Sequence, residues 1–247
     1  MRKLIAGNWK MNGLRADGLG LALAVASRAK TAPPSCDLLI CPPATLLVEI
    51  GAALEGSGIA LGGQDCHDRA RGAHTGDISA SMLRDAGCVY VILGHSERRH
   101  DHHETNTLVR AKVETARAEG LIPIVCIGET AAERDAGGTL AVLGSQLAGS
   151  LPEGLGGDDI VVAYEPAWAI GSGTTPKDHE IAEAHGFVRA TLVRQVADAD
   201  AVRILYGGSV NSTNAGGVLA IANVDGALVG GASLDANSFW AIAESVR

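Results

Sequence analysis

The sequence of 247 residues lacks several features that mark whole classes of protein. It has no run of 18 apolar residues, which argues against a membrane-spanning helix. It has no basic block to set against a formal net charge of -8, so we expect neither nucleic acid nor a membrane surface as a partner. The first ten residues, MRKLIAGNWK, place only three apolar residues after two cations, too few for the apolar region of a secretory signal.

The cysteines lack the spacing of a disulfide framework or a metal site. There are five of them, an odd number, and no two form a CxxC pair. This pattern indicates a reducing compartment and predicts a cytoplasmic protein in which each thiol is a small buried apolar side chain. The five are Cys36, Cys41, Cys66, Cys88 and Cys126.

What the chain does contain is typical of a soluble globular protein with a large core. Hydrophobic residues make up 47% of the sequence and glycines number 32, which predicts many tight turns. The composition does not change along the chain. We therefore expect a single domain that spans residues 1–247.

Eight short apolar runs, each ending in glycine or polar residues, predict eight strands. Segments with helical periodicity, such as Leu140, Leu143, Leu147 and Leu151, lie between many of them. Thr130 with Glu133 and Thr175 with Pro176 mark two helix starts. Continuous apolar strands that alternate with helices indicate a parallel sheet. The predicted strands are residues 4–9, 38–41, 59–62, 89–93, 122–127, 160–164, 203–206 and 227–229.

Eight such units predict the α/β fold class and most simply close into a single (β/α)8 barrel with eight parallel strands. A doubly wound open sheet is the alternative, but no GxGxxG motif follows the first strand to support it. The active site of such a barrel lies at the carboxyl ends of the strands. The residues at those ends are therefore the candidates for chemistry.

An ammonium, an imidazole and a carboxylate converge at these ends. Asn8 and Lys10 follow the first strand, His95 follows the fourth, and Glu165 follows the sixth. Taken alone, Lys10 could be a solvated surface charge and His95 a structural histidine at a helix start. Their predicted convergence with a carboxylate favours proton-transfer chemistry. Glu129 ends the fifth strand, and Gln64 and Asp65 end the third.

Glycine-rich turns after the last two strands predict an anion site. Gly207 and Gly208 precede Ser209 after the seventh strand, and Gly230 and Gly231 follow the eighth. Barrel enzymes often hold a phosphate there on backbone N–H groups, although glycine also serves plain turns.

A histidine cluster, His100, His102 and His103 with Glu104, raises the question of a metal site. It lacks the ligand spacings of a zinc site and lies in a polar stretch near a helix. We interpret it as a solvated loop and helix start and expect no metal.

Six motifs in the correct order closely resemble the triosephosphate isomerase family. They are AGNWKMN (6–12), GHSERR (94–99), CIGE (126–129), AYEPAWAIGSG (163–173), YGGSV (206–210) and DGALVGGASL (225–234). The resemblance implies the TIM barrel and the interconversion of dihydroxyacetone phosphate and D-glyceraldehyde 3-phosphate through an enediolate, in glycolysis and gluconeogenesis and without a cofactor.

The resemblance also implies the role of each site residue. Glu165 would be the base, His95 a neutral electrophile at a helix N-terminus, as this family is known to use, and Lys10 and Asn8 would bind substrate and support the enediolate. Glu97 would lie near Lys10 and hold its side chain without touching the substrate. The phosphate would lie on the N–H groups of Gly171, Ser209, Gly230 and Gly231. The lid would comprise Trp168, Ala169, Ile170, Gly171, Ser172 and Gly173.

By the same resemblance, residues 64–79 form a dimerisation loop whose tip, with Thr75 and Gly76, reaches the partner near its Lys10 and Met11. This implies a homodimer. The chain departs from the family at Ala167, where valine is usual, at His74, where an aromatic ring is common, and at Asp65, where asparagine is frequent. By the family pattern, two residues are also missing between Gly173 and Pro176. These departures bear on lid motion and interface strength.

Two other functions compete with the isomerase. A sugar-phosphate aldolase or metal-dependent epimerase would need a Schiff-base lysine or several metal ligands at the strand ends, where the sixth strand offers Glu165. A phosphate-binding scaffold would not need the set of Lys10, His95 and Glu165.

Overall fold

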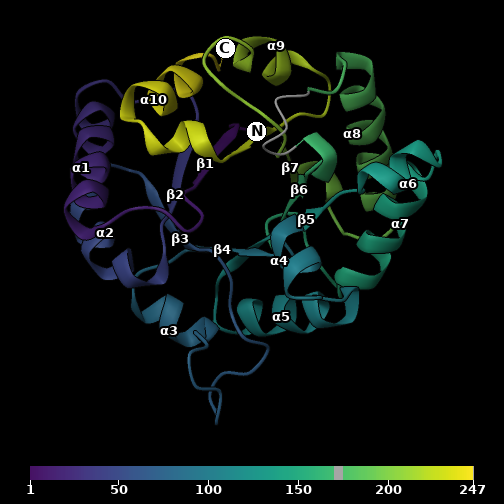
Figure 1. Ribbon diagram of the computed structural model, residues 1–247, viewed down its shortest axis with the longest axis horizontal. Coiled ribbons are helices and arrows are strands. Elements are labelled where there is room, and N and C mark those ends of the chain that lie inside the picture. Colours follow the sequence, from purple (N-terminus) through teal and green to yellow (C-terminus); the bar gives the residue numbers. More distant parts are fainter. Residues whose placement is uncertain (170–174, 247) are drawn as a thin grey trace.

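Eight parallel strands close into a barrel in the computed structural model, which describes residues 1–169 and 175–246 (Figure 1). Each strand pairs with its sequence neighbours, and β1 pairs with β8 to complete the ring. This closure excludes the open doubly wound sheet. The strands are β1 Leu4–Asn8, β2 Asp37–Cys41, β3 Ala60–Gly63, β4 Tyr90–Leu93, β5 Ile122–Ile127, β6 Val161–Tyr164, β7 Arg203–Tyr206 and β8 Gly226–Val229.

Helices surround the barrel on its outer side (Figure 1). They are α1 Arg15–Thr31, α2 Leu47–Leu54, α3 Ala80–Asp85, α4 Ser96–Asp101, α5 Asn106–Ala118, α6 Ala131–Asp135, α7 Thr139–Ser150, α8 Asp178–Leu192, α9 Ala215–Ala220 and α10 Ala236–Glu244. Short 3-10 helices occur at η1 Ala44–Leu46, η2 Ala167–Ala169, η3 Ala199–Ala201 and η4 Gly231–Leu234. Among the described residues, no helix is long and apolar enough to cross a membrane.

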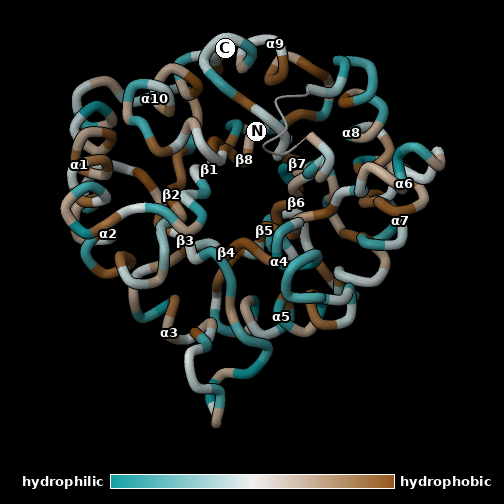
Figure 2. Tube along the Cα trace, in the orientation of Figure 1, coloured by the Kyte–Doolittle hydropathy of each residue, from teal (hydrophilic) through white to brown (hydrophobic). Residues whose placement is uncertain are grey.

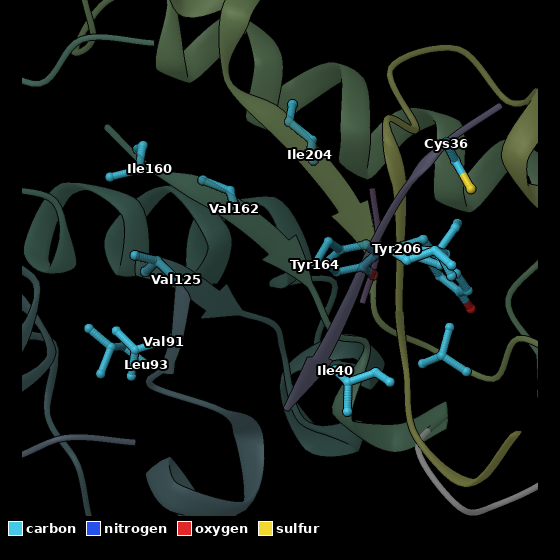
Figure 3. Close-up of a cluster of buried hydrophobic side chains, with 14 of the residues drawn as sticks. Cys36, Ile40, Val91, Leu93, Val125, Ile160, Val162, Tyr164, Ile204 and Tyr206 are labelled. Carbon is cyan, nitrogen blue, oxygen red and sulfur yellow. The ribbon is translucent and has the colours of Figure 1, made fainter. Parts of the chain in front are cut away.

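The strands are apolar throughout because they are buried on both faces. Within β5, Ile124 and Cys126 point into the barrel, while Val125 and Ile127 pack outward against the helices. Because side chains alternate along a strand, each strand contributes to two hydrophobic cores, one inside the barrel and one between the strands and the helices. Figure 3 shows part of the outer core, with Val162 and Ile204 on adjacent strands. In Figure 2 the strands near the barrel centre include many brown, apolar segments.

The predicted strands match the observed ones to within one residue at either end. The expected helix start at Thr175 is wrong, because α8 begins at Asp178 with Lys177 before it, and the Lys177 N–H donates to Glu180. The expected capping box of Thr130 and Glu133 is present at the start of α6. All five cysteines are buried and free, as predicted.

One loop, residues 64–79 between β3 and α3, projects from the rim of the barrel (Figure 1). Its neck is closed by the His67 N–H, which donates to the Ile78 carbonyl at 2.8 Å, and by a bridge between His67 and Ser79. The exposed tip includes Thr75 and Gly76, and the loop is largely pale or teal in Figure 2.

Candidate active site

A cavity of about 390 Å³ opens at the carboxyl ends of the strands. It is lined by residues that follow β1, β4, β6, β7 and β8, as the barrel fold predicts. Those that bear on the chemistry are Asn8, Lys10, His95, Glu165, Gly207, Ser209, Gly230 and Gly231. The structure therefore brings these eight residues together, and each of them was singled out from the sequence.

His95 is fixed by the start of α4. It is the N-cap residue of that helix, and its Nδ1 accepts the backbone N–H of Glu97 at 3.3 Å. A ring nitrogen that accepts a hydrogen bond carries no proton, so we assign the proton of the neutral imidazole to Nε2. Nε2 lies 3.0 Å from Oε1 of Glu165. The donor of His95 is thereby aimed into the cavity.

Glu165 is a buried carboxylate with two partners. Its Oε1 faces His95, and its Oε2 accepts the backbone N–H of Ser96 at 3.0 Å. Burial raises the pKa of this carboxyl, but the hydrogen bonds and charges of His95, Ser96 and Lys10 outweigh it and lower the pKa overall. The group is therefore ionised at neutral pH.

The pKa of His95 depends on opposing influences. Burial lowers it, while the charge and hydrogen bond of Glu165 raise it and prevail. The N–H of Glu97 at Nδ1 supports the neutral ring, because only a neutral ring offers a lone pair there. If a carbonyl oxygen replaces Glu165 at Nε2, the raising influence weakens and the neutral imidazole is favoured.

Lys10 is held in an unusual backbone conformation, with a φ of 54° in the left-handed region. Its N–H donates to Oδ1 of Asn8 at 3.0 Å, and its carbonyl accepts from Nε2 of Gln64 at 2.8 Å. The amine Nζ lies 2.6 Å from Oε1 of Glu97. Glu97 is thus an ion-pair partner of Lys10 and lies near it, as the resemblance implied.

The glycine turns approach the cavity closely. A β-carbon on Gly208 would lie 2.1 Å from the Tyr206 hydroxyl, so no side chain fits there. None of the hydrogen bonds formed among the described residues uses the N–H of Ser209, Gly230 or Gly231. These three donors border the cavity and are available to an anion.

The described part of the expected lid begins at Trp168. Its indole Nε1 donates to Oε1 of buried Glu129 at 2.8 Å, and the guanidinium of Arg134 lies 3.8 Å from the ring centre. Ala169 is buried beside it. The remaining predicted lid positions, Ile170, Gly171, Ser172 and Gly173, lie outside the described residues.

Three features of the site were not apparent from the sequence. The backbone N–H of Ser96 donates to Glu165, and Gly207, which the sequence placed only in the anion-binding turn, leaves room for the Glu165 side chain, so neither presents a reactive group that a motif search would find. Arg134 was missed because it lies on α6, away from any strand end.

The polar stretch from His100, near the end of α4, to Glu104 is only partly solvated. His100 is exposed, as expected, but the interpretation of Glu104 as part of a solvated loop is wrong. Its buried carboxylate lies 2.6 Å from both Arg98 and Lys112. Glu104 can be buried because these two cations neutralise its charge.

A buried carboxylate and an imidazole in one cavity, with an ammonium and N–H donors that no described residue occupies beside them, define a class: a barrel enzyme that moves a proton on a small anionic substrate. The sequence profile of triosephosphate isomerase matches residues 3–246. Triosephosphate isomerase of Afipia carboxidovorans is 57% identical over 246 residues, covering 99% of this chain and 98% of that protein. The Granulibacter bethesdensis enzyme is 55% identical over 247 residues, covering 99% of both.

A solved structure agrees with these sequence comparisons. The crystal structure of triosephosphate isomerase from Bartonella henselae superimposes with a TM-score of 0.92 at 44% identity, and the match covers 99% of both chains. The chain belongs to the triosephosphate isomerase family. The activity of this family is the aldose–ketose interconversion of dihydroxyacetone phosphate and D-glyceraldehyde 3-phosphate in glycolysis. An aldolase, an epimerase or a scaffold protein is thereby excluded.

Proposed function

We propose that Glu165 is the base that moves the proton between the two carbons of the triose phosphate. The observation that carries this proposal is its position, with Oε1 3.0 Å from Nε2 of His95 in the same cavity. Its lowered pKa leaves it ionised and ready to accept a proton. To reach a substrate carbon, the carboxylate must move away from Ser96 and so lose the hydrogen bond that the Ser96 N–H donates to it.

His95 and Lys10 stabilise the negative charge that then develops on the substrate oxygens. A donor at Nε2 and an ammonium beside it are in place before the charge appears, so little reorganisation is needed in the transition state. Asn8 supports the same oxygens and also fixes the Lys10 backbone. Glu97 holds the Lys10 amine and is a positioning residue.

The substrate phosphate is bound by the N–H groups of Ser209, Gly230 and Gly231. By the family resemblance, the N–H of Gly171 is a fourth donor to the phosphate, and residues 170–173 form the greater part of the lid. Closure of that lid would exclude water and protect the enediolate from losing its phosphate. Trp168, anchored on Glu129, would be the fixed end about which the lid moves.

The chain functions as a cytoplasmic homodimer in this proposal, with residues 1–247 as one domain. Four exposed apolar side chains support the dimer: Met11 (96% exposed), Leu14 (77%), Val48 (73%) and Met82 (56%). The first three lie in neighbouring segments, because Arg15 pairs with Glu49 on α2 and Gln64 bonds the Lys10 carbonyl. Met82 lies on α3, whose Leu83 packs against Gly63 beside Gln64. A second subunit that inserts the tip of its projecting loop near Met11 would cover them.

The test is a coupled assay with glyceraldehyde 3-phosphate. Replacing Glu165 with Gln should lower kcat by about 10²–10⁴-fold while the fold is retained, because the amide cannot accept the proton. Replacing Glu114, an exposed carboxylate on α5, with Gln should leave the activity unchanged. Near-normal turnover of the Glu165→Gln enzyme would refute the assignment of the base.

A further inference from the structure

The projecting loop gathers three side chains that can ligate a metal. His67, His74 and Asp77 each offer a ligand atom, and these atoms all lie within 4.8 Å of one another. Nε2 of His67 and Oδ2 of Asp77 are 3.7 Å apart. No part of the isomerase site uses them.

We propose that these three residues bind a divalent transition metal ion of the Zn²⁺ class. Tetrahedral bonds of about 2.0–2.2 Å to zinc place neighbouring ligand atoms about 3.3–3.6 Å apart. The His67–Asp77 pair is already close to that spacing. His74 completes the set by turning about its side-chain bonds, and water takes the fourth position.

The backbone holds this arrangement ready. The His67 N–H bonds the Ile78 carbonyl at 2.8 Å and closes the neck of the loop, and the Asp77 N–H bonds the His74 carbonyl at 3.1 Å in a tight turn. The His74 ring lies over Gly72, where a β-carbon would be 3.1 Å from its Nε2. A larger residue at position 72 would displace this ligand.

His67 also has the partner that a metal-binding histidine needs. Its Nδ1 lies 3.0 Å from Oδ1 of Asp68. When Nε2 binds the metal, Nδ1 must carry the proton and can donate it to this carboxylate, which orients the ring. In the other tautomer Nδ1 accepts the N–H of Arg69, also at 3.0 Å, so the site can exist with or without the ion.

The donor set decides which ion fits. Two imidazoles and one carboxylate suit Zn²⁺ and its neighbours, whereas Mg²⁺ and Ca²⁺ prefer sites made of oxygen. At present the rings of His67 and His74 stack, with centres 4.0 Å apart and planes inclined by 32°. Simple ring stacking is the competing explanation, and it predicts no metal binding.

The test is a titration of the full-length protein with Co²⁺, followed by visible absorption, and with Zn²⁺, followed by calorimetry, after treatment with a chelator. We expect one ion per chain. The His74→Phe variant keeps a ring for stacking but loses the ligand, so it should lose binding at this site. The Asp68→Asn variant should bind about 10–100-fold more weakly because it lacks the orienting carboxylate.

The matched control is His100→Asn, which removes an exposed histidine outside the loop and should bind as the unaltered protein does. Equal affinity of the His74→Phe variant and the unaltered protein would overturn the proposal. So would a thiolate-to-cobalt absorption band, since it would assign the ion to cysteine. All three ligands belong to one chain, but the same loop is proposed to contact a second subunit. Light scattering on the same samples therefore shows whether a loss of metal binding in the His74→Phe variant accompanies a change in assembly or occurs without one.

Discussion

The side chain of Glu165 occupies its place because Gly207 has none. A β-carbon on Gly207 would lie 2.6 Å from Cγ of Glu165, well inside the contact distance of two carbon atoms. The two residues follow neighbouring strands, β6 and β7, so a change at one is transmitted directly to the other.

We therefore predict that the Gly207→Ala variant folds but loses about 10²-fold in kcat, as expected for a misplaced catalytic group. The assay with glyceraldehyde 3-phosphate measures this loss. Gly216→Ala is the control, because its added carbon meets no atom within 4 Å on helix α9. An unchanged kcat in Gly207→Ala would show that the Glu165 position is not constrained by this contact.

A second prediction concerns a cluster of charges formed by buried Lys112 and Glu104 with half-buried Arg98 and Asp65. Burial raises the pKa of Glu104, but the hydrogen bonds and charges of Lys112 and Arg98 outweigh it and lower the pKa overall. For Asp65, burial prevails over the same cations and its pKa is raised. The two carboxylates thus contribute differently to stability.

Glu104→Gln should lower the free energy of unfolding by about 3–5 kcal/mol, because it leaves Lys112 buried with too little negative charge. Asp65→Asn should cost about 1 kcal/mol or less, since the carboxylate it removes is partly exposed and disfavoured by burial. Urea denaturation at neutral pH measures both values. Equal losses for the two variants would contradict this account.

A third prediction follows from His185, a buried residue whose Nδ1 bonds the carbonyl of Asn223 at 2.9 Å. Burial is the main cause that lowers its pKa from 6.5 to about 4. Between these two values the unfolded chain takes up a proton at His185 and the folded chain does not. Stability from this residue is thus complete above about pH 6.5 and is lost as the pH falls toward 4, by about 3 kcal/mol in all.

In the His185→Asn variant the amide can still donate to Asn223, but the titrating ring is gone. Its unfolding free energy should fall less steeply between about pH 6.5 and pH 4 than that of the unaltered protein. Comparing the two slopes cancels the cost of the cavity that the smaller side chain leaves. Parallel pH profiles would show that His185 does not govern acid stability.

The dimer gives a fourth prediction. Met82→Arg places a charge on the exposed face of α3 beside the projecting loop and should shift the protein toward the monomer. Val193→Arg changes an apolar side chain of similar exposure (61%) after helix α8 and should leave assembly intact. Light scattering at low micromolar concentration distinguishes them. A fully active monomer of the unaltered chain would refute the proposed interface.

The sequence predicted the strands well because residues such as Val125 and Cys126 are apolar on both faces of the sheet. It did not predict α1, whose alanines, leucines and glycines carry no clear helical period, or α9, where Gly216 and Gly217 weaken the helical signal. These helices form because the segments that connect parallel strands pack against the outside of the barrel. Tertiary packing, and not local preference, determines them.

The candidate site was predictable where a reactive side chain ends a strand, as His95 and Glu165 do. It was not predictable where backbone geometry or space is what matters, as with the N–H of Ser96 and the missing side chain of Gly207. The cluster of His67, His74 and Asp77 was missed because its members converge only when the neck of the loop closes.

The support of Lys10 has a consequence for how this chain can evolve. Its left-handed backbone is kept in place by Asn8 from its own strand and by Gln64 from a segment 54 positions away. Such a conformation in a residue other than glycine costs about 1–3 kcal/mol and persists only while its neighbours enforce it. Positions 8, 10 and 64 should therefore vary together or not at all across descendants of this sequence.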